Sequence, residues 1–300
     1  MYRRAICGLL GFAVSFSAAS TVPAHAQVAV PQQVTSSYNL DLVPSPDGHS
    51  SVMITIVGGR EQLFLREDEK ARWIQITKDD ADHEDPAWSP DGRQIAFVLT
   101  NGESRVVYVM NRNGSAKRPI TPSDVRAIHP SWTPDGKRLL YSTDDDVSPP
   151  AKNASTIHEV DLETGKIKSL VTGGVNTFPV MSPDGRKIAF RRIIQENNSE
   201  IFVANSDGSI PQNVTRHPSF EGWPQWSPDG AQIAFAANRN GQDFQIFHMR
   251  PDGSNIRLIA ETRGRATSPK WSADGKAVFF TNCRSADGVR GCDIYSASIP

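Results

Sequence analysis

The sequence has few cysteines, little net charge and a single long apolar run, and each shortage excludes a class of protein. Its 300 residues include three cysteines and carry a formal net charge of −1 at pH 7. A general nucleic-acid-binding protein would show a basic stripe, and a near-neutral balance argues against one. After residue 26 no segment supplies the roughly 20 apolar residues of a membrane-spanning helix. We therefore expect no nucleic acid as a partner and no membrane span.

The apolar run lies at the N-terminus and has the pattern of a secretion signal. A basic start precedes residues 5–19, which are apolar or small throughout. Ala24 and Ala26 then form an A-x-A-like cleavage site. This pattern predicts a cleaved signal peptide at 1–26 and a mature, exported chain at 27–300.

The mature part keeps two cysteines, Cys283 and Cys292, nine positions apart. An exported protein meets an oxidising compartment, in which two such thiols form a disulfide. A cross-strand pair in a hairpin brings the Cβ atoms within bonding range. We therefore expect a disulfide between Cys283 and Cys292.

The motifs of common enzyme classes are also missing. The sequence contains no G-x-S-x-G nucleophile elbow, no phosphate loop and no dinucleotide fingerprint. His158 and Glu159 lack the second histidine of the H-E-x-x-H zinc motif. The chain is therefore not predicted to be an enzyme, and no cofactor or metal is expected.

What the sequence does contain is one motif in six copies. The clearest read AWSPDGRQIAF at 87–97 and QWSPDGAQIAF at 225–235. Aligned on their turn glycines, the copies are centred on Gly48, Gly92, Gly136, Gly185, Gly230 and Gly275. The intervals of 44, 44, 49, 45 and 45 residues match the period of propeller blades, about 40–45 residues. The repeats fill the mature chain and predict one all-β domain, a six-bladed β-propeller.

Each repeat has the strands of one blade. A short strand is followed by Ser-Pro-Asp-Gly, with Thr133 in place of the serine in one copy and Ala273 in place of the proline in another. In this turn proline presets φ and glycine takes the left-handed position of a hairpin. The next two strands are apolar on both faces, as in Val106–Met110, so neighbouring blades must cover both sides. The tryptophans before the turns are predicted to pack between blades; these are Trp88, Trp132, Trp226 and Trp271.

The two ends of the chain predict how the ring closes. The last repeat ends after its third strand and lacks an outer one. The N-terminal VPQQVTSS resembles IPQNVTRHP at 210–218, which is the outer strand of the fourth repeat. We expect residues 30–36 to supply the missing strand of blade six, because closure removes sheet edges that invite aggregation.

The repeat W-S-P-D-G, followed by two residues and I-A-F, is similar to the TolB-like β-propeller repeat of bacterial envelope proteins. NRNGQDFQIFHMRPDG at 238–253 resembles the continuation of that repeat, and the resemblance covers all six copies. It implies a periplasmic scaffold that binds another envelope protein, such as a peptidoglycan-associated lipoprotein. We expect a monomeric, stand-alone propeller without the N-terminal domain that TolB carries.

One slot of the repeat changes residue type from blade to blade. Three positions before the tryptophan slot stand Asp41, Asp85, His129, Phe178, Trp223 and Ser268. Proline follows in five copies and fixes the chain as it enters the innermost strand, so these residues are expected to ring the channel mouth. Acids on one side and aromatic residues on the other suit a peptide with an apolar anchor and a basic neighbour. Stacking of the aromatic rings on the prolines, or drift of free loops, would give the same pattern.

Two other groups are candidates for metal binding. His83, His129 and His217 lie in segments that link blades, and they raise the alternative of a metal-dependent polysaccharide lyase. Carboxylates that suit calcium or a basic partner lie at two places, namely Asp79, Asp80, Asp82, Glu84 and Asp85 before blade two and Asp144–Asp146 in blade three. Neither group has the spacing of a known metal motif, so separate histidines, and acidic loops without calcium, are the simpler interpretations.

Overall fold

A computed structural model describes residues 28–35, 38–143, 154–239, 241, 243–286 and 289–299. Within these ranges every regular element is a β-strand, and no helix long and apolar enough to cross a membrane occurs. The expected signal peptide and the acidic run Asp144–Asp146 lie outside the described residues.

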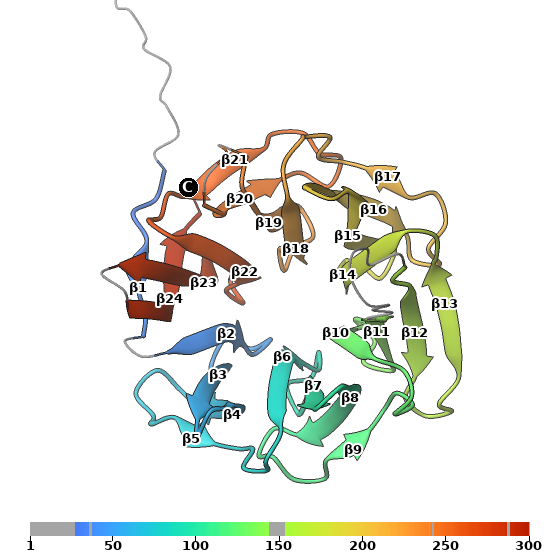
Figure 1. Ribbon diagram of the computed structural model, residues 1–300, viewed down its shortest axis with the longest axis vertical. Helices are drawn as coiled ribbons and strands as arrows, with labels where there is room; N and C mark the ends of the chain where they lie inside the picture. The colour runs from blue at the N-terminus through green and yellow to red at the C-terminus, as the bar shows by residue number, and fades with distance from the viewer. Residues whose placement is uncertain are drawn as a thin grey trace, which may run out of the picture.

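The strands form six four-stranded antiparallel sheets, arranged as blades around a central channel (Figure 1). Blades one to three are β2 (Asn39–Pro44), β3 (Ser51–Val57), β4 (Arg60–Arg66), β5 (Ile74–Gln75); β6 (Asp82–Trp88), β7 (Gln94–Asn101), β8 (Ser104–Asn111), β9 (Arg118–Pro119); and β10 (Ala127–Trp132), β11 (Arg138–Thr143), β12 (Ile157–Asp161), β13 (Ile167–Val171). Blades four to six are β14 (Val175–Met181), β15 (Lys187–Gln195), β16 (Asn198–Asn205), β17 (Gln212–Asn213); β18 (Glu221–Trp226), β19 (Ile233–Ala237), β20 (Gln245–Met249), β21 (Arg257–Ala260); and β22 (Arg265–Trp271), β23 (Ala277–Ala286), β24 (Val289–Ser298), β1 (Gln32–Gln33). The predicted all-β, six-bladed propeller is confirmed.

Each inner hairpin is held by the same hydrogen bonds around its Asp-Gly turn, in which a Ser or Thr hydroxyl donates to the Asp carboxylate. In blade one Ser45 Oγ donates to Asp47 Oδ1 (2.5 Å) and accepts a bond from the Ser50 N–H (2.9 Å). The His49 N–H also donates to Asp47 Oδ1 (2.9 Å). These bonds, that of Ser45 first, lower the pKa of Asp47. The recurring turn carboxylates therefore have a structural role.

The tryptophans before the turns join each blade to the preceding one, as predicted. Trp88 is buried, and its Nε1 donates to the Val43 carbonyl of blade one (3.0 Å). Equivalent bonds of 3.1 Å run from Trp132 to Ala87, from Trp226 to Val180 and from Trp271 to Gln225. Met181 and Pro44 take this slot in blades four and one, so an indole bond cannot form at those two junctions.

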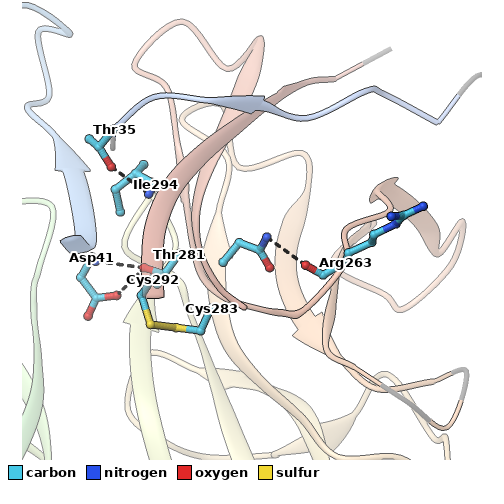
Figure 2. Close-up of a disulfide and its surroundings, with 8 residues drawn as sticks. Thr35, Asp41, Arg263, Thr281, Cys283, Cys292 and Ile294 are labelled. Atoms are coloured by element: carbon cyan, nitrogen blue, oxygen red, sulfur yellow. Dashed lines mark hydrogen bonds between the residues drawn. A yellow bond between two sulfur atoms is a disulfide. The ribbon is translucent and has the colours of Figure 1, made fainter. Parts of the chain in front are cut away.

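The ring closes as the sequence predicts, with β1 added to β24 as the outer strand of blade six. The Val34 N–H donates to the Ile294 carbonyl (2.7 Å), and the Ile294 N–H donates to Thr35 Oγ1 (3.1 Å; Figure 2). In blade four, Thr215 Oγ1 accepts the equivalent bond from the Ile201 N–H (3.0 Å). The similarity of PQQVT and PQNVT therefore reflects one structural role.

Two contacts at the closure were not predicted. Before β1, Ala29 forms a parallel bridge with Ala260 at the end of β21, so the N-terminal segment spans blades five and six. Where blade six meets blade one, the Asp41 N–H donates to Thr281 Oγ1 (3.0 Å; Figure 2). This bond joins the two ends of the ring at the junction where Pro44 replaces the tryptophan.

Cys283 and Cys292 lie opposite each other in the β23–β24 pair, with their Cα atoms 4.0 Å apart. The structure joins them by a disulfide (Figure 2). The bond links the two strands of blade six that lie between the inner strand β22 and the closing strand β1. It therefore adds a covalent tie to the blade in which the two ends of the chain meet.

Candidate binding site at the channel mouth

The six residues of the variable slot lie together at the centre of the ring. All six line one pocket, together with three of the prolines that follow them and with Ser131, Gln225 and Lys270. Figure 1 shows the inner strands that carry them around the centre of the ring. We call this space the channel pocket. Here the structure places every residue that sequence analysis had singled out as a partner-binding candidate.

Each of the six residues has a left-handed backbone, with φ between 45° and 56°. In every inner strand the register shifts across this position, so the residue forms a β-bulge. A left-handed conformation costs roughly 1–2 kcal/mol for a residue other than glycine. Bulky residues such as Phe178 and Trp223 are rare there. Sequence analysis missed this strain, because the residue types give no sign of it.

Two acids, Asp41 and Asp85, form one side of the channel pocket. Burial raises the pKa of Asp85 to about 7, and repulsion from Asp41 and Glu84 adds to the shift. The His129 N–H donates to Asp85 Oδ2 (3.2 Å) and opposes it in part. Beside them burial also raises the pKa of Glu61 to about 7, with Glu84 and Asp41 contributing. This side of the mouth therefore holds carboxyl groups that take up protons close to neutral pH.

Lys270 enters the same pocket from β22. Burial lowers the pKa of its ammonium group, and the attraction of Asp41 and Asp85 opposes that shift. The ammonium group of Lys270 thus lies among the acids of the pocket. A basic group of a ligand would add to this cluster and relieve the repulsion between the two carboxylates.

Aromatic rings form the opposite side of the pocket and contact one another across successive blades. The ring centroids of His129 and Phe178 are 3.7 Å apart, and those of Phe178 and Trp223 are 5.1 Å apart. Trp223 meets Phe244 edge to face at 5.8 Å. The rings thus form a continuous apolar wall, which can receive an apolar side chain of a ligand.

The three histidines of the linking segments have different surroundings. His83 is completely buried, and its Nε2 lies 3.0 Å from Asp79 Oδ1. His217 Nδ1 is 2.9 Å from Ser219 Oγ, whereas His129 lines the channel pocket. Within the described ranges no three His, Cys, Asp or Glu side chains are grouped so that they could hold a metal ion.

The acidic segment before blade two is mostly neutralised by the protein's own cations. Arg60 pairs with Asp80 (2.9 Å) and with Asp82 (3.3 Å). Lys117 pairs with Asp79. Only the last acid of this segment lines the channel pocket, so the segment does not form one open carboxylate patch.

Asp85→Asn is expected to stabilise the protein at neutral pH and to change little near pH 4. The pKa of Asp85 is about 7 in the folded state and about 4 in the unfolded chain. Between these values only the folded state holds the proton, so stability falls as the pH rises from about 4 to about 7. Asparagine does not titrate and still accepts the His129 bond.

Urea unfolding across this pH range checks the prediction. The stability gained by the variant should grow with pH to roughly 2–4 kcal/mol. The turn aspartates do not interfere, because their pKa values are lowered and they titrate below this range. If Asp85→Asn were more stable than the parent by the same amount at pH 4 and pH 7, Asp85 would not hold a proton in the folded state.

Comparisons with known proteins agree with this architecture. The family model described as "TolB beta propeller domain" matches residues 32–170 and 148–295. None of the curated proteins matches the sequence. The solved structure of a putative TolB from Agrobacterium tumefaciens is similar, with a TM-score of 0.68, 21% identity and coverage of 89% of this chain and 92% of that one.

Two further solved structures share the fold. TolB from Acinetobacter baumannii has a TM-score of 0.63 and 18% identity; the match covers 88% of this chain and 64% of that longer one. An oligogalacturonate lyase in complex with manganese has a TM-score of 0.60 and 15% identity, with 91% of each chain covered. Such low identities show the fold alone, and the proteins with this fold include an enzyme.

Proposed function

The chain belongs to the family of TolB β-propeller domains, and we propose that it is a periplasmic protein that holds a peptide segment of another cell-envelope protein in the channel pocket. Residues 1–26 would direct its export, and residues 27–300 would form the mature protein. The family resemblance suggests a peptidoglycan-associated lipoprotein as the partner. The protein would act as a binding scaffold and not as a catalyst.

One observation carries this proposal, namely that six strained residues of changing type face one pocket. Strain of this kind gathers at functional sites, because a purely structural slot would use glycine and avoid the cost. The turn slots of the repeat hardly vary and four of the six tryptophan slots hold tryptophan, whereas this slot holds acids, a histidine, aromatic residues and a serine. The residue type of this slot changes from blade to blade although each residue bears the cost of a left-handed backbone. This combination supports selection of these side chains for contact with a ligand.

Replacing Phe178 and Trp223 together with alanine is expected to reduce capture of the partner at least 10-fold. Aromatic residues in desolvated pockets supply much of the energy of protein interfaces, about 2 kcal/mol or more each. The measurement is affinity capture from crosslinked cell envelopes with the mature protein as bait. The double variant also loses ring contacts within the mouth, so capture is compared well below its melting temperature.

Ile210→Ala provides a matched control for this experiment. Ile210 is 67% exposed and lies in the turn between β16 and β17, outside the channel pocket. Its removal takes away a large exposed apolar side chain and should leave capture unchanged. Capture that survives the double substitution, or that falls equally in the control, would place the site elsewhere.

A metal-dependent polysaccharide lyase is the alternative, and it draws on the shared fold with the oligogalacturonate lyase. His83, His129 and His217 would have to supply its metal ligands. Each of them has separate contacts, and one is completely buried. The channel pocket therefore gives the binding role the stronger support.

A further inference from the structure

The side chain of Arg191, on β15, lies on the aromatic side of the mouth without an acidic partner. Its guanidinium carbon is 4.8 Å from the centre of the Phe178 ring and 5.3 Å from that of Phe220. Nε donates to Thr177 Oγ1 (2.9 Å). In the described part of the chain this is its only hydrogen bond, and no carboxylate forms an ion pair with it.

The neighbouring blade makes room for this arginine. A Cβ atom on Gly222 in β18 would lie 3.3 Å from Arg191 Cδ. The backbone of Gly222 is not left-handed, so space and not φ favours glycine there. The equivalent positions of the other inner strands hold larger residues, namely Leu40, Glu84, Ile128, Thr177 and Thr267. The site of Arg191 is therefore built by two blades together.

The charge of Arg191 is held at a cost that no carboxylate of the described residues offsets. Burial lowers the pKa of its guanidinium to about 10, so the group is still charged at neutral pH. Stacking on aromatic rings returns part of this cost. Nearby, the fold does pair Arg239 with the buried Glu221, whose Oε1 lies 2.7 Å from Nη2. An arginine that stays unpaired beside a paired one is open to an anion from outside.

A second arginine, Arg265, packs against two other rings of the aromatic group. The guanidinium of Arg265, at the start of β22, is 5.0 Å from the centre of the Phe244 ring and 5.8 Å from that of Trp223. It too forms no ion pair with a described residue. A guanidinium is a planar fork that matches a carboxylate through two parallel hydrogen bonds.

We propose that Arg191 binds a carboxylate that lies next to the apolar anchor of the bound peptide. This inference rests on the proposed function and defines its ligand more closely. Arg191 touches Phe178, which lines the channel pocket, so the carboxylate belongs to the anchor residue or to its neighbour, about 3.5 Å along the chain. The bound segment is dipolar, with its acid at Arg191 and its base at Asp41 and Asp85.

Three small probes test the proposal by NMR or calorimetric titration. Acetyl-Trp-Glu-amide carries a side-chain carboxylate, acetyl-Gly-Trp carries a C-terminal one, and acetyl-Trp-Gln-amide is the neutral, isosteric control. We expect at least one carboxylate probe to bind about 10-fold more tightly than the neutral probe. The tighter of the two carboxylate probes identifies the source of the carboxylate.

Arg191→Gln should abolish this preference, and Arg191→Lys, which keeps the charge but loses the fork, should weaken it. Arg192→Gln is the matched control. Arg192 follows on the same strand, and it too is a stacked arginine, bonded to Asn176 Oδ1 (2.7 Å) and lying 4.8 Å from the Phe202 ring centre. It should leave the preference unchanged, and thermal melts confirm that each variant is folded.

The outcomes separate the two claims. Equal affinity for all three probes, or a preference that survives in Arg191→Gln, overturns the carboxylate site but leaves the apolar anchor intact. Binding of no probe, or binding that the Phe178 and Trp223 substitutions do not affect, counts against the channel pocket as a peptide site. In that case the proposed function fails together with the inference.

Discussion

A chain that begins at Tyr38 is expected to melt roughly 10 °C below one that begins at Val28, because it cannot close the propeller. It lacks β1, the Thr35 hydroxyl that accepts from Ile294, and the Ala29 contact with blade five. Losing a strand's ladder bonds together with its packing costs roughly 3–5 kcal/mol. One kcal/mol lowers the melting temperature of a domain of this size by about 2–4 °C.

Two point variants test whether the closing strand acts like an ordinary outer strand. Thr35→Val and Thr215→Val remove the same kind of hydroxyl acceptor, one at the closure and one in blade four. Each leaves a backbone N–H without its partner, so each should cost about 1–2 kcal/mol in urea unfolding. Size-exclusion chromatography of the shortened chain should also show self-association, because β24 becomes an exposed sheet edge.

The closure would be refuted by a shortened chain that melts like its parent and stays monomeric. It would also be weakened if Thr215→Val destabilised the protein and Thr35→Val did not. Such a result would mean that the N-terminal segment rests on blade six without holding the ring together. Thr215 Oγ1 also donates to the buried Glu200 (2.7 Å), whereas the bond of Thr35 Oγ1 to Asp293 is longer (3.4 Å), so Thr215→Val is expected to cost the more of the two.

Much of the architecture was predictable because its determinants are local and repeated. Each Ser-Pro-Asp-Gly turn satisfies its own hydrogen bonds within six residues, so the motif alone indicates a hairpin. The closing strand was also predictable, because Thr35 stands in a pattern that the outer strand around Thr215 repeats. Apolar strands without alternation correctly indicated blades that are covered on both faces.

The parts that sequence analysis missed depend on contacts between blades. Nothing in the residue types of Phe178 or Trp223 signals a left-handed backbone, because the slot adopts it in all six inner strands whichever residue fills it. The place of Arg191 depends on a missing side chain at Gly222, which is 31 positions away. The acidic segment looked like one patch, but Arg60 and Lys117 divide it, and both come from other strands or turns.

Gly253→Ala is expected to be among the most destabilising single substitutions outside the core, with a cost of more than about 3 kcal/mol. Gly253 ends the turn between β20 and β21, and its φ is +83°. An added Cβ atom would lie 1.9 Å from the carbonyl oxygen of Val214, in the link after β17 of the preceding blade. That oxygen belongs to backbone and cannot swing aside as a side chain would.

Gly165→Ala separates the clash from the conformational strain. Gly165 ends the corresponding turn of blade three with φ +70°, but a Cβ atom there would meet nothing within 4 Å. It should therefore cost only the left-handed strain, about 1–2 kcal/mol. Urea unfolding gives the difference in stability between Gly253→Ala and Gly165→Ala. This difference measures how closely the turn of blade five packs against blade four. Equal losses of stability would mean that the turns ending at Gly165 and Gly253 contribute backbone geometry alone. The blades would then be held together by their inner strands and tryptophans.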